Sequence, residues 1–423
     1  MARDAPTAPM VRYRRTAATS GAAVLAVALA ALLLAVGAGS FRTLQGSAPS
    51  GVTRTYYIGA DPVLWNYTPS GHDVITGTAL GASNATVQYY TERNATYLGT
   101  SFEKCLYQQF VDASFTALEP RPAAEAYLGL LGPVIYAAVG DTVQVWFHNA
   151  CPWAESIAPE GVEVAPSSDG TNFNGSVSYG GSVPTNGTVE YTWLVPPSAG
   201  PGSSGAPAAL WLYQSGTQAA NSTDLGLIGP ILISAAGANN PDGTPAGPAE
   251  NVILLASDLD ENDSTFLRYN VEHFAEDPSA VDLSQPRWVG SLNKYSINGF
   301  LYGNLPPLTF PHGTEVVWWL LGAGRGYPTL TWTSGSVRLG GVTTDRVPLA
   351  PSVSERAVMW ANTSGTWLVE SSVPGQLAGG LEGQFVVSAA TPAAARDLPW
   401  GPARSSAELP APSALLGGAA RWA

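Results

Sequence analysis

The sequence predicts an all-β protein built from two β-sandwiches in tandem. Charged residues make up only 12% of the 423 residues, whereas the chain contains 46 glycines and 34 prolines. This composition suits many short strands joined by tight turns, and it argues against long helices rich in Lys and Glu. Thirteen tryptophans and seventeen tyrosines are enough to fill two sizeable cores.

The chain begins with a basic and then apolar segment at residues 1–40. Three arginines within 12–15 precede an uncharged stretch whose apolar centre, 21–39, is about as long as a membrane-spanning helix. This charge pattern predicts that the N-terminus stays in the cytoplasm and the rest is exported. Two interpretations remain open, a signal peptide cleaved near the small residues 37–39 and an uncleaved anchor. We expect a secreted, cell-surface or lumenal protein, with membrane contact only through this segment if it is uncleaved.

Eight Asn-x-Ser/Thr triplets are spread over the body of the chain. One triplet means little, but a set that follows an export signal predicts a glycosylated surface. The two cysteines, Cys105 and Cys151, lie at the edges of predicted strands and can form a disulfide in an oxidising compartment, the alternative being two separate buried thiols. The asparagines of the triplets are Asn66, Asn84, Asn94, Asn174, Asn186, Asn221, Asn262 and Asn362.

Residues 53–236 contain the first run of strand-like segments. Apolar or alternating stretches rich in β-branched and aromatic residues are separated by turns of Gly, Pro and Asn. This pattern predicts the antiparallel strands of a first sandwich domain. The clearest segments are 54–58, 106–110, 142–147 and 189–193.

A second run of strands is predicted at 251–389, after a linker at 237–250 that is rich in Gly, Pro and Asn. Residues 390–423 are rich in Ala, Pro and Ser, which predicts a disordered tail. The two runs share a weak repeat, because 131–146 resembles 304–319 in its Pro-containing turn and the apolar strand that follows. A duplicated sandwich is the simplest explanation.

Several motifs occur in an order that is typical of one protein family. They include Leu-Gly-Leu-Leu-Gly-Pro at 128–133, Gly-Asp-Thr-Val at 140–143, Asp-Glu-Asn at 260–262 and Ile-Asn-Gly at 297–299. Together they resemble the ceruloplasmin/hephaestin-like ferroxidase branch of the multicopper oxidases over residues 54–389. The resemblance implies two tandem cupredoxin-like Greek-key β-sandwiches, of the plastocyanin type, with copper-dependent oxidase chemistry in the family.

The family's copper ligands are replaced in this chain. A blue-copper site needs a thiolate and two imidazoles, and a trinuclear cluster needs further His-x-His pairs. By the resemblance, Ser371 stands for the thiolate cysteine, Gln376 for an imidazole and Leu381 for the axial ligand. The family's copper positions are occupied by Ala158, Glu160, Gln214, Gly216, Pro328, Thr331, Thr333, Glu370, Ser371, Ser372, Gln376 and Leu381.

The four histidines do not replace these ligands. His72, His148, His273 and His312 lack the His-x-His and His-x3-His spacings of metal sites, which favours surface or capping roles. The acidic loop 258–263 has the oxygen ligands that Ca²⁺ prefers, but it is not an EF-hand, and we favour a solvated turn.

These observations favour an exported, non-catalytic binding or scaffold module that has lost copper, needs no cofactor and binds an unknown protein partner. One alternative is a multicopper oxidase, a ferroxidase in iron or copper homeostasis, which would need copper and a partner chain to complete its trinuclear site. Another is a Ca²⁺- or iron-binding accessory subunit. The net charge of −13 argues against nucleic acid as a partner, because phosphate binding needs Lys and Arg.

Overall fold

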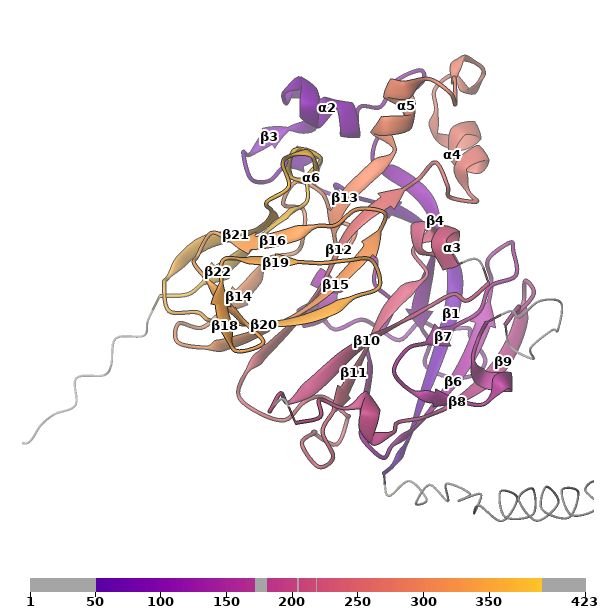
Figure 1. The fold of residues 1–423 in the computed structure, drawn as a ribbon. Helices are drawn as coiled ribbons and strands as arrows, with labels where there is room; N and C mark the ends of the chain where they lie inside the picture. Colours follow the sequence, from indigo (N-terminus) through magenta and orange to yellow (C-terminus); the bar gives the residue numbers. More distant parts are fainter. Residues whose placement is uncertain (1–50, 172–180, 204, 218, 390–423) are drawn as a thin grey trace, which may run out of the picture. The chain divides into compact units, whose positions relative to one another are not determined.

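The computed structural model describes residues 51–171, 181–203, 205–217 and 219–389. The predicted signal or anchor segment 1–40 and the predicted tail 390–423 lie outside this range and stay predictions. Among the described helices, none has the length and apolar character that crossing a membrane requires. Two pairs of facing sheets confirm the predicted all-β class (Figure 1).

The first sandwich pairs a five-stranded sheet, in the order β4-β1-β6-β9-β8, with a four-stranded sheet, β5-β11-β10-β7. Alternation along β6 directs Val143, Val145 and Phe147 into the core, as the period of two in the sequence predicts. The strands are β1 (Thr53–Asn66), β4 (Ser101–Gln109), β5 (Ile135–Ala138), β6 (Thr142–Asn149), β7 (Ala158–Pro159), β8 (Glu163–Val164), β9 (Gly187–Leu194), β10 (Ala208–Gln214) and β11 (Ile228–Ser234).

The second sandwich pairs a six-stranded sheet, β13-β12-β15-β20-β17-β18, with a five-stranded sheet, β14-β22-β21-β16-β19. Its strands are β12 (Glu250–Asp260), β13 (Asn293–Ile297), β14 (Leu308–Phe310), β15 (Glu315–Gly324), β16 (Thr329–Trp332), β17 (Val337–Leu339), β18 (Val342–Thr344), β19 (Arg346–Pro348), β20 (Ser354–Trp360), β21 (Gly365–Ser371) and β22 (Glu382–Val387).

The same strand pairings occur in both sandwiches. β1 pairs with β4 antiparallel and with β6 parallel, and β12 pairs in the same way with β13 and β15. β5 lies parallel to β11, as β14 does to β22. The expected antiparallel pairing holds for the other strand pairs of the two sandwiches, whereas these four are parallel. An alternating pattern reports which face of a strand is buried and not the direction of its neighbour, so the sequence did not distinguish them.

Short helices and hairpins fill the connections. Helices α2, α4 and α5 gather at one end of the second sandwich's large sheet (Figure 1). The helices are α2 (Ala85–Thr91), α3 (Ala219–Leu225), α4 (Leu267–Phe274), α5 (Pro286–Ser291) and α6 (Pro374–Ala378); the 3₁₀ helices are η1 (Leu80–Ala82), η2 (Ala123–Leu128), η3 (Pro166–Ser168), η4 (Pro197–Ala199) and η5 (Pro278–Ala280); a small hairpin is made by β2 (His72–Asp73) and β3 (Thr78–Ala79).

A shared apolar cluster joins the two sandwiches. Leu210 and Leu212 of β10 belong to the same buried cluster as Ile253 of β12 and Trp319 of β15. The alternate residues of β12, such as Leu254, point instead into the second core. Because both faces of β12 are buried, its residues 252–256 form a continuous apolar run and not an alternating one.

Candidate functional site

The four family copper positions of the first sandwich lie close together, where β7 meets the end of β10. Ala158 pairs with Gln214 across the two strands, and the backbone N–H of Glu160 donates to the carbonyl of Leu212 at 2.9 Å. Gly216, two residues after Gln214, forms an isolated β-bridge with Thr171. The structure thus brings these four positions together.

This place does not fit a metal-binding imidazole. Ala158 has no donor atom, and a Cβ added at Gly216 would collide with the backbone carbonyl of Gly170. A histidine at position 216 therefore requires the backbone to move. Burial raises the pKa of Glu160 above its ordinary value, which disfavours its charged, metal-binding form.

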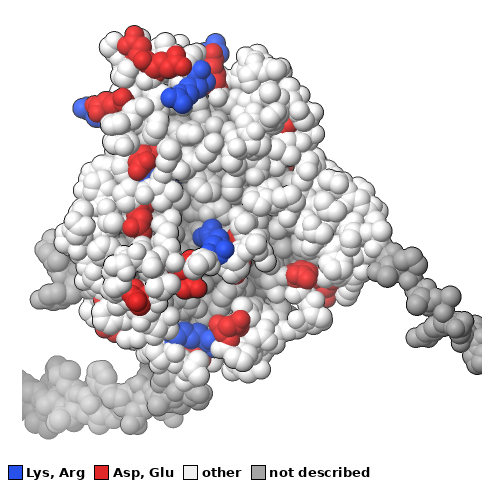
Figure 2. Space-filling view, turned by 180° about the vertical axis from the view of Figure 1, so that it is seen from behind, with Lys and Arg blue, Asp and Glu red and all other residues white. Residues whose placement is uncertain are grey.

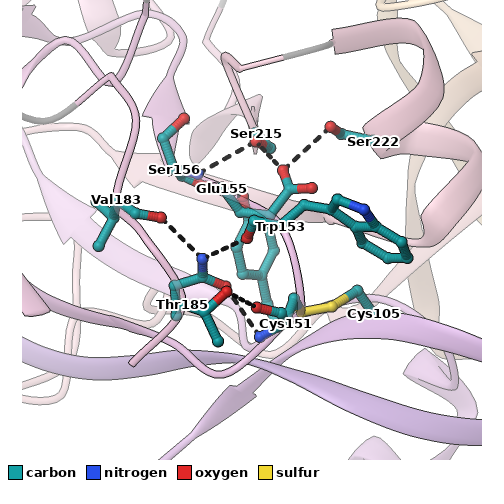
Figure 3. The surroundings of a disulfide bond; sticks show 11 residues. Cys105, Cys151, Trp153, Glu155, Ser156, Val183, Thr185, Ser215 and Ser222 are labelled. Atoms are coloured by element: carbon teal, nitrogen blue, oxygen red, sulfur yellow. Dashed lines mark hydrogen bonds between the residues drawn. A yellow bond between two sulfur atoms is a disulfide. The ribbon is translucent and has the colours of Figure 1, made fainter. Parts of the chain in front are cut away.

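A hydrogen-bonded network of hydroxyl groups occupies the neighbouring space (Figure 3). Ser215 Oγ donates to Glu155 Oε2 at 2.6 Å, and Ser222 Oγ donates to the same oxygen at 3.2 Å. The backbone N–H of Ser156 donates to Ser215 Oγ at 3.2 Å. Burial raises the pKa of Glu155, although the two serine hydrogen bonds act in the opposite direction. Two serine hydroxyls thus share one carboxylate oxygen of a buried glutamate.

A disulfide lies beside this network (Figure 3). Cys105 of β4 and Cys151, just beyond β6, are joined by a disulfide, with their Cα atoms 6.2 Å apart. That separation is within the ordinary range for the bond. Both cysteines are completely buried, and the Trp153 ring packs edge-on against Phe266 nearby.

In the second sandwich, the position that the resemblance assigns to blue copper holds a serine–glutamine pair. Ser371 Oγ, at the end of β21, donates to Gln376 Oε1 of α6 at 2.8 Å and accepts the backbone N–H of Val373 at 3.1 Å. The backbone N–H of Ser371 donates to the carbonyl of Leu381 at 3.0 Å. Ser371, Gln376 and Leu381 are all buried, so the structure places these three positions together.

The other positions that the resemblance assigns to copper in the second sandwich lie on both faces of the sheet that contains β16 and β21. Leu330 of β16 lies opposite Ser371, so both side chains point into the core, and Pro328 shares that side by strand alternation. Thr331 lies opposite Glu370 and therefore points to the other face, together with the exposed Thr333. The carbonyl of Thr329 accepts the backbone N–H of Ser372 at 2.8 Å. The positions thus form one buried group and one outer group.

The histidines lie far apart along the fold. His72 Nδ1 is 2.8 Å from the carbonyl oxygen of Ser70 in the β2 hairpin. His148 stacks on Phe115 with ring centroids 5.1 Å apart, and His273 is in the last turn of α4. His312 is in the turn before β15. In the part of the chain that the structure describes, no group of three or more His, Cys, Asp or Glu side chains is arranged to hold a metal.

The acidic loop differs from the expected solvated turn. Glu261 is completely buried, and its Oε1 lies 2.5 Å from Lys104 Nζ. Asp260 and Asp263 both pair with Arg325. The ion pair of Glu261 escaped sequence reasoning because its partner is 157 residues away. The available signal was Lys104 itself, since its neighbours at the alternate positions of the strand, Phe102 and Leu106, are apolar.

The predicted glycosylation sites differ in exposure. Of the described side chains, Asn94 and Asn262 are half-buried, and Asn262 Nδ2 donates to Asp260 Oδ1 at 2.6 Å. Asn174 and the side chain of Asn221 lie outside the described residues. The exposed members are Asn66, Asn84, Asn186 and Asn362. Glycan attachment stays a prediction at all eight.

A pair of glutamates beside Ser371 predicts that stability falls as the pH rises. Glu382 lies opposite Glu370, and burial, followed by the charges of Asp73 and Glu370, raises its pKa from 4.5 to about 7. The folded state then binds a proton more tightly than the unfolded chain, so this contribution to stability is complete below pH 4.5 and is lost as the pH rises through about 7.

We expect Glu382→Gln to reduce the loss of stability between about pH 5.5 and about pH 7.5. Urea denaturation at both values measures this difference. Glu276→Gln is the matched control, because Glu276 is exposed on the segment after α4. A Glu382→Gln protein with the parent's full pH dependence would contradict the prediction.

Known proteins are similar in sequence to this chain over most of its length. No family model matches the chain. The chain is 34% identical to human ceruloplasmin over 345 residues, which are 79% of this chain and 32% of that protein. It is 33% identical to the human ferroxidase HEPHL1 over 341 residues, 80% of this chain and 29% of the relative, and 32% identical to rat hephaestin with the same coverage. The chain spans about a third of the length of these relatives.

Solved structures share the fold at lower sequence identity. A multicopper oxidase crystal structure superposes with a TM-score of 0.50 at 14% identity, covering 79% of this chain and 89% of that one. A copper nitrite reductase from Nitrosomonas europaea superposes with a TM-score of 0.51 at 13% identity, covering 79% of this chain and 94% of that one. These similarities support the cupredoxin-like sandwich.

Proposed function

The chain belongs to the ceruloplasmin/hephaestin branch of the multicopper oxidase family, and from that premise we propose that it is a cupredoxin protein that has lost copper. In this proposal it acts as an exported, non-catalytic binding or scaffold module. The observation that carries the proposal is the hydrogen bond between Ser371 and Gln376 at the family's blue-copper position.

The donor set at this position is unsuited to copper. The metal needs a soft thiolate and two imidazoles, whereas Ser371 offers a neutral hydroxyl and Gln376 an amide. Ser371 Oγ already donates to Gln376 and accepts from Val373. A copper ion would therefore have to break two buried hydrogen bonds for two weak ligands, which is unfavourable.

The first sandwich supports the same proposal. Its family positions bring together Ala158, Gln214 and Gly216, and the close approach of Gly170 leaves no room for a side chain at 216. Around them, Glu155 and Ser215 form a closed hydrogen-bond network. Such a network orders the loops of a sandwich, and loops on a rigid scaffold are common binding surfaces.

Export is supported by three features of the chain. The basic and apolar segment 1–40 is typical of export signals, and eight Asn-x-Ser/Thr triplets follow it. The disulfide between Cys105 and Cys151 is the type of bond that persists in oxidising compartments. We propose a protein partner for the exported module, with membrane contact only if segment 1–40 remains uncleaved.

The alternative function is ferroxidase activity in a complex with a second chain. It is favoured by the name of one relative, a ferroxidase, and by the fact that this chain spans about a third of that protein. The partner would have to supply nearly all copper ligands, because the family positions described here offer no imidazole or thiolate.

Copper analysis of the full chain, expressed in a copper-replete host, tests the proposal. We expect the parent protein to contain no stoichiometric copper and to show no blue absorption band. The variant Pro328→His/Ser371→Cys/Gln376→His restores a thiolate and two imidazoles on the buried side of β16 and β21, and we expect it to bind about one copper atom per chain.

The matched control for that variant is Gln376→His alone, which adds an imidazole without the thiolate and should give no blue band. Parent protein that carries one or more copper atoms per chain and oxidises Fe²⁺ would overturn the proposal. The parent measurement decides the question even if the triple variant folds poorly.

A further inference from the structure

A cleft of about 660 Å³ lies between the two sandwiches, on the edge of their shared cluster. Its walls come from β10 and the loop before it on one side, and from β15, β17 and β20 on the other. None of its lining residues is a family copper position, so an inference from this cleft goes beyond the proposed function and does not depend on copper loss.

Strand pairing gathers aromatic and charged side chains on the cleft's floor. Trp319 of β15 lies opposite Arg356 of β20, and Glu315 lies opposite Trp360. Residues directly opposite each other, and residues two apart along a strand, point to the same face of a sheet. The four side chains therefore form one patch, in which the Trp360 side chain is 54% exposed.

Two arginines of this cleft have unused hydrogen-bonding capacity. The Arg356 guanidinium lies 5.8 Å from the centre of the Trp319 ring, and its buried Nε has no hydrogen-bond partner among the described residues. Arg338 of β17 lies opposite Val358, between Arg356 and Trp360 along that face, and forms no ion pair within the described part of the chain. A buried donor without an acceptor costs free energy that a bound acceptor recovers.

Basic side chains are scarce on this protein, and two of its arginines line this one cleft. The chain has 19 Lys and Arg against 32 Asp and Glu. On the face shown in Figure 2, isolated basic groups are scattered over a surface that is mostly uncharged. Glu315 and Glu355 also line the cleft, and their charges disfavour a polyanion such as nucleic acid.

We propose that this cleft binds a small organic monoanion with a flat aromatic body. Its carboxylate, sulfonate or phosphate monoester group accepts hydrogen bonds from Arg338 and Arg356, because planar guanidinium groups recognise such oxyanions. Its ring packs against the exposed face of Trp360. The volume of the cleft lies within the range of small-molecule sites, roughly 300–1,000 Å³.

Fluorescence titration of the full chain with 1-anilinonaphthalene-8-sulfonate tests this proposal. This probe carries an aromatic body and one sulfonate, and N-phenyl-1-naphthylamine is nearly the same molecule without the charge. We expect saturable binding of the sulfonate by the parent protein. Arg338→Gln and Arg356→Gln should each weaken its binding about tenfold, the effect of losing one charge-assisted hydrogen bond, and change binding of the uncharged probe much less.

Further variants separate the roles of ring and charge. Trp360→Ala should weaken both probes, because both stack on the indole. Arg346→Gln and Tyr327→Ala are the matched controls, since both residues are exposed and neither lines the cleft. Benzoate should compete with the sulfonate probe, whereas inorganic phosphate, which lacks a ring, should not.

The inference is overturned if the parent does not bind the sulfonate probe, or if both arginine variants bind it as the parent does. It is also overturned if the two probes lose affinity equally on arginine substitution, which would indicate an apolar groove without anion recognition. Arg338 is exposed, so Arg338→Gln decides the outcome even if Arg356→Gln disturbs folding.

Discussion

Replacing Lys104 with methionine should lower the free energy of unfolding by about 3–5 kcal/mol, the usual cost of removing one partner from a buried ion pair. Lys104 Nζ lies 2.5 Å from Glu261 Oε1 and donates to the Asp224 carbonyl at 2.6 Å, with both charged side chains fully buried. Tyr67 OH donates to the same carboxylate oxygen at 2.6 Å. Without the lysine, the Glu261 carboxylate stays buried with its main counter-charge missing.

Urea denaturation at neutral pH measures this loss. The exposed pair of Arg287 and Glu92, 3.4 Å apart, provides the control, and Glu92→Gln should cost less than about 1 kcal/mol. The double variant Lys104→Met/Glu261→Gln should recover part of the stability, because it leaves neither Lys104 nor Glu261 charged without the other. A Lys104→Met protein as stable as the Glu92→Gln control would show that the pair is unimportant for folding.

Replacing both Cys105 and Cys151 with alanine should cost about 2–4 kcal/mol of stability. The disulfide joins cysteines 46 residues apart and therefore restricts the unfolded chain between residues 105 and 151. Both cysteines are fully buried against the core, so the alanines also leave a small unfilled volume. The midpoint of urea denaturation, compared with that of the parent, measures the effect.

Parent protein unfolded with a reducing agent in the same buffer is the control for the loss of the bond alone. Its midpoint should fall close to that of the double variant. Two free thiols detected in the unreduced, unfolded parent would contradict the disulfide. An unchanged midpoint in the double variant would show that the bond contributes little to stability.

The strands and the fold family could be predicted from the sequence, because both depend on local or inherited patterns. Alternation marked β6, and the ordered motifs of residues 54–389 indicated the family that the relatives show. The helices α4 and α5 were not predicted, since they are short and α4 has no capping side chain. Helices of this length depend mainly on tertiary packing.

Features that join distant parts of the chain could not be predicted. A lysine in a strand is normally exposed, and only the fold shows that Lys104 meets Glu261 from the other sandwich. The cleft that contains Arg356 could not be predicted for the same reason, because strands of both sandwiches contribute its walls. Local sequence patterns carry no information about such long-range contacts.

The close approach of the Gly170 carbonyl to Gly216 makes a histidine harder to introduce by mutation in the first sandwich than in the second. In the second sandwich a few codon changes reinstate a ligand set, because Ser371 and Gln376 still face each other. In the first sandwich, a histidine at position 216 would collide with the backbone carbonyl of Gly170. The loop that carries Gly170 must therefore change its conformation first. If copper has been lost as proposed, descendants of this gene can thus regain a ligand set around Ser371 more readily than one around Gly216.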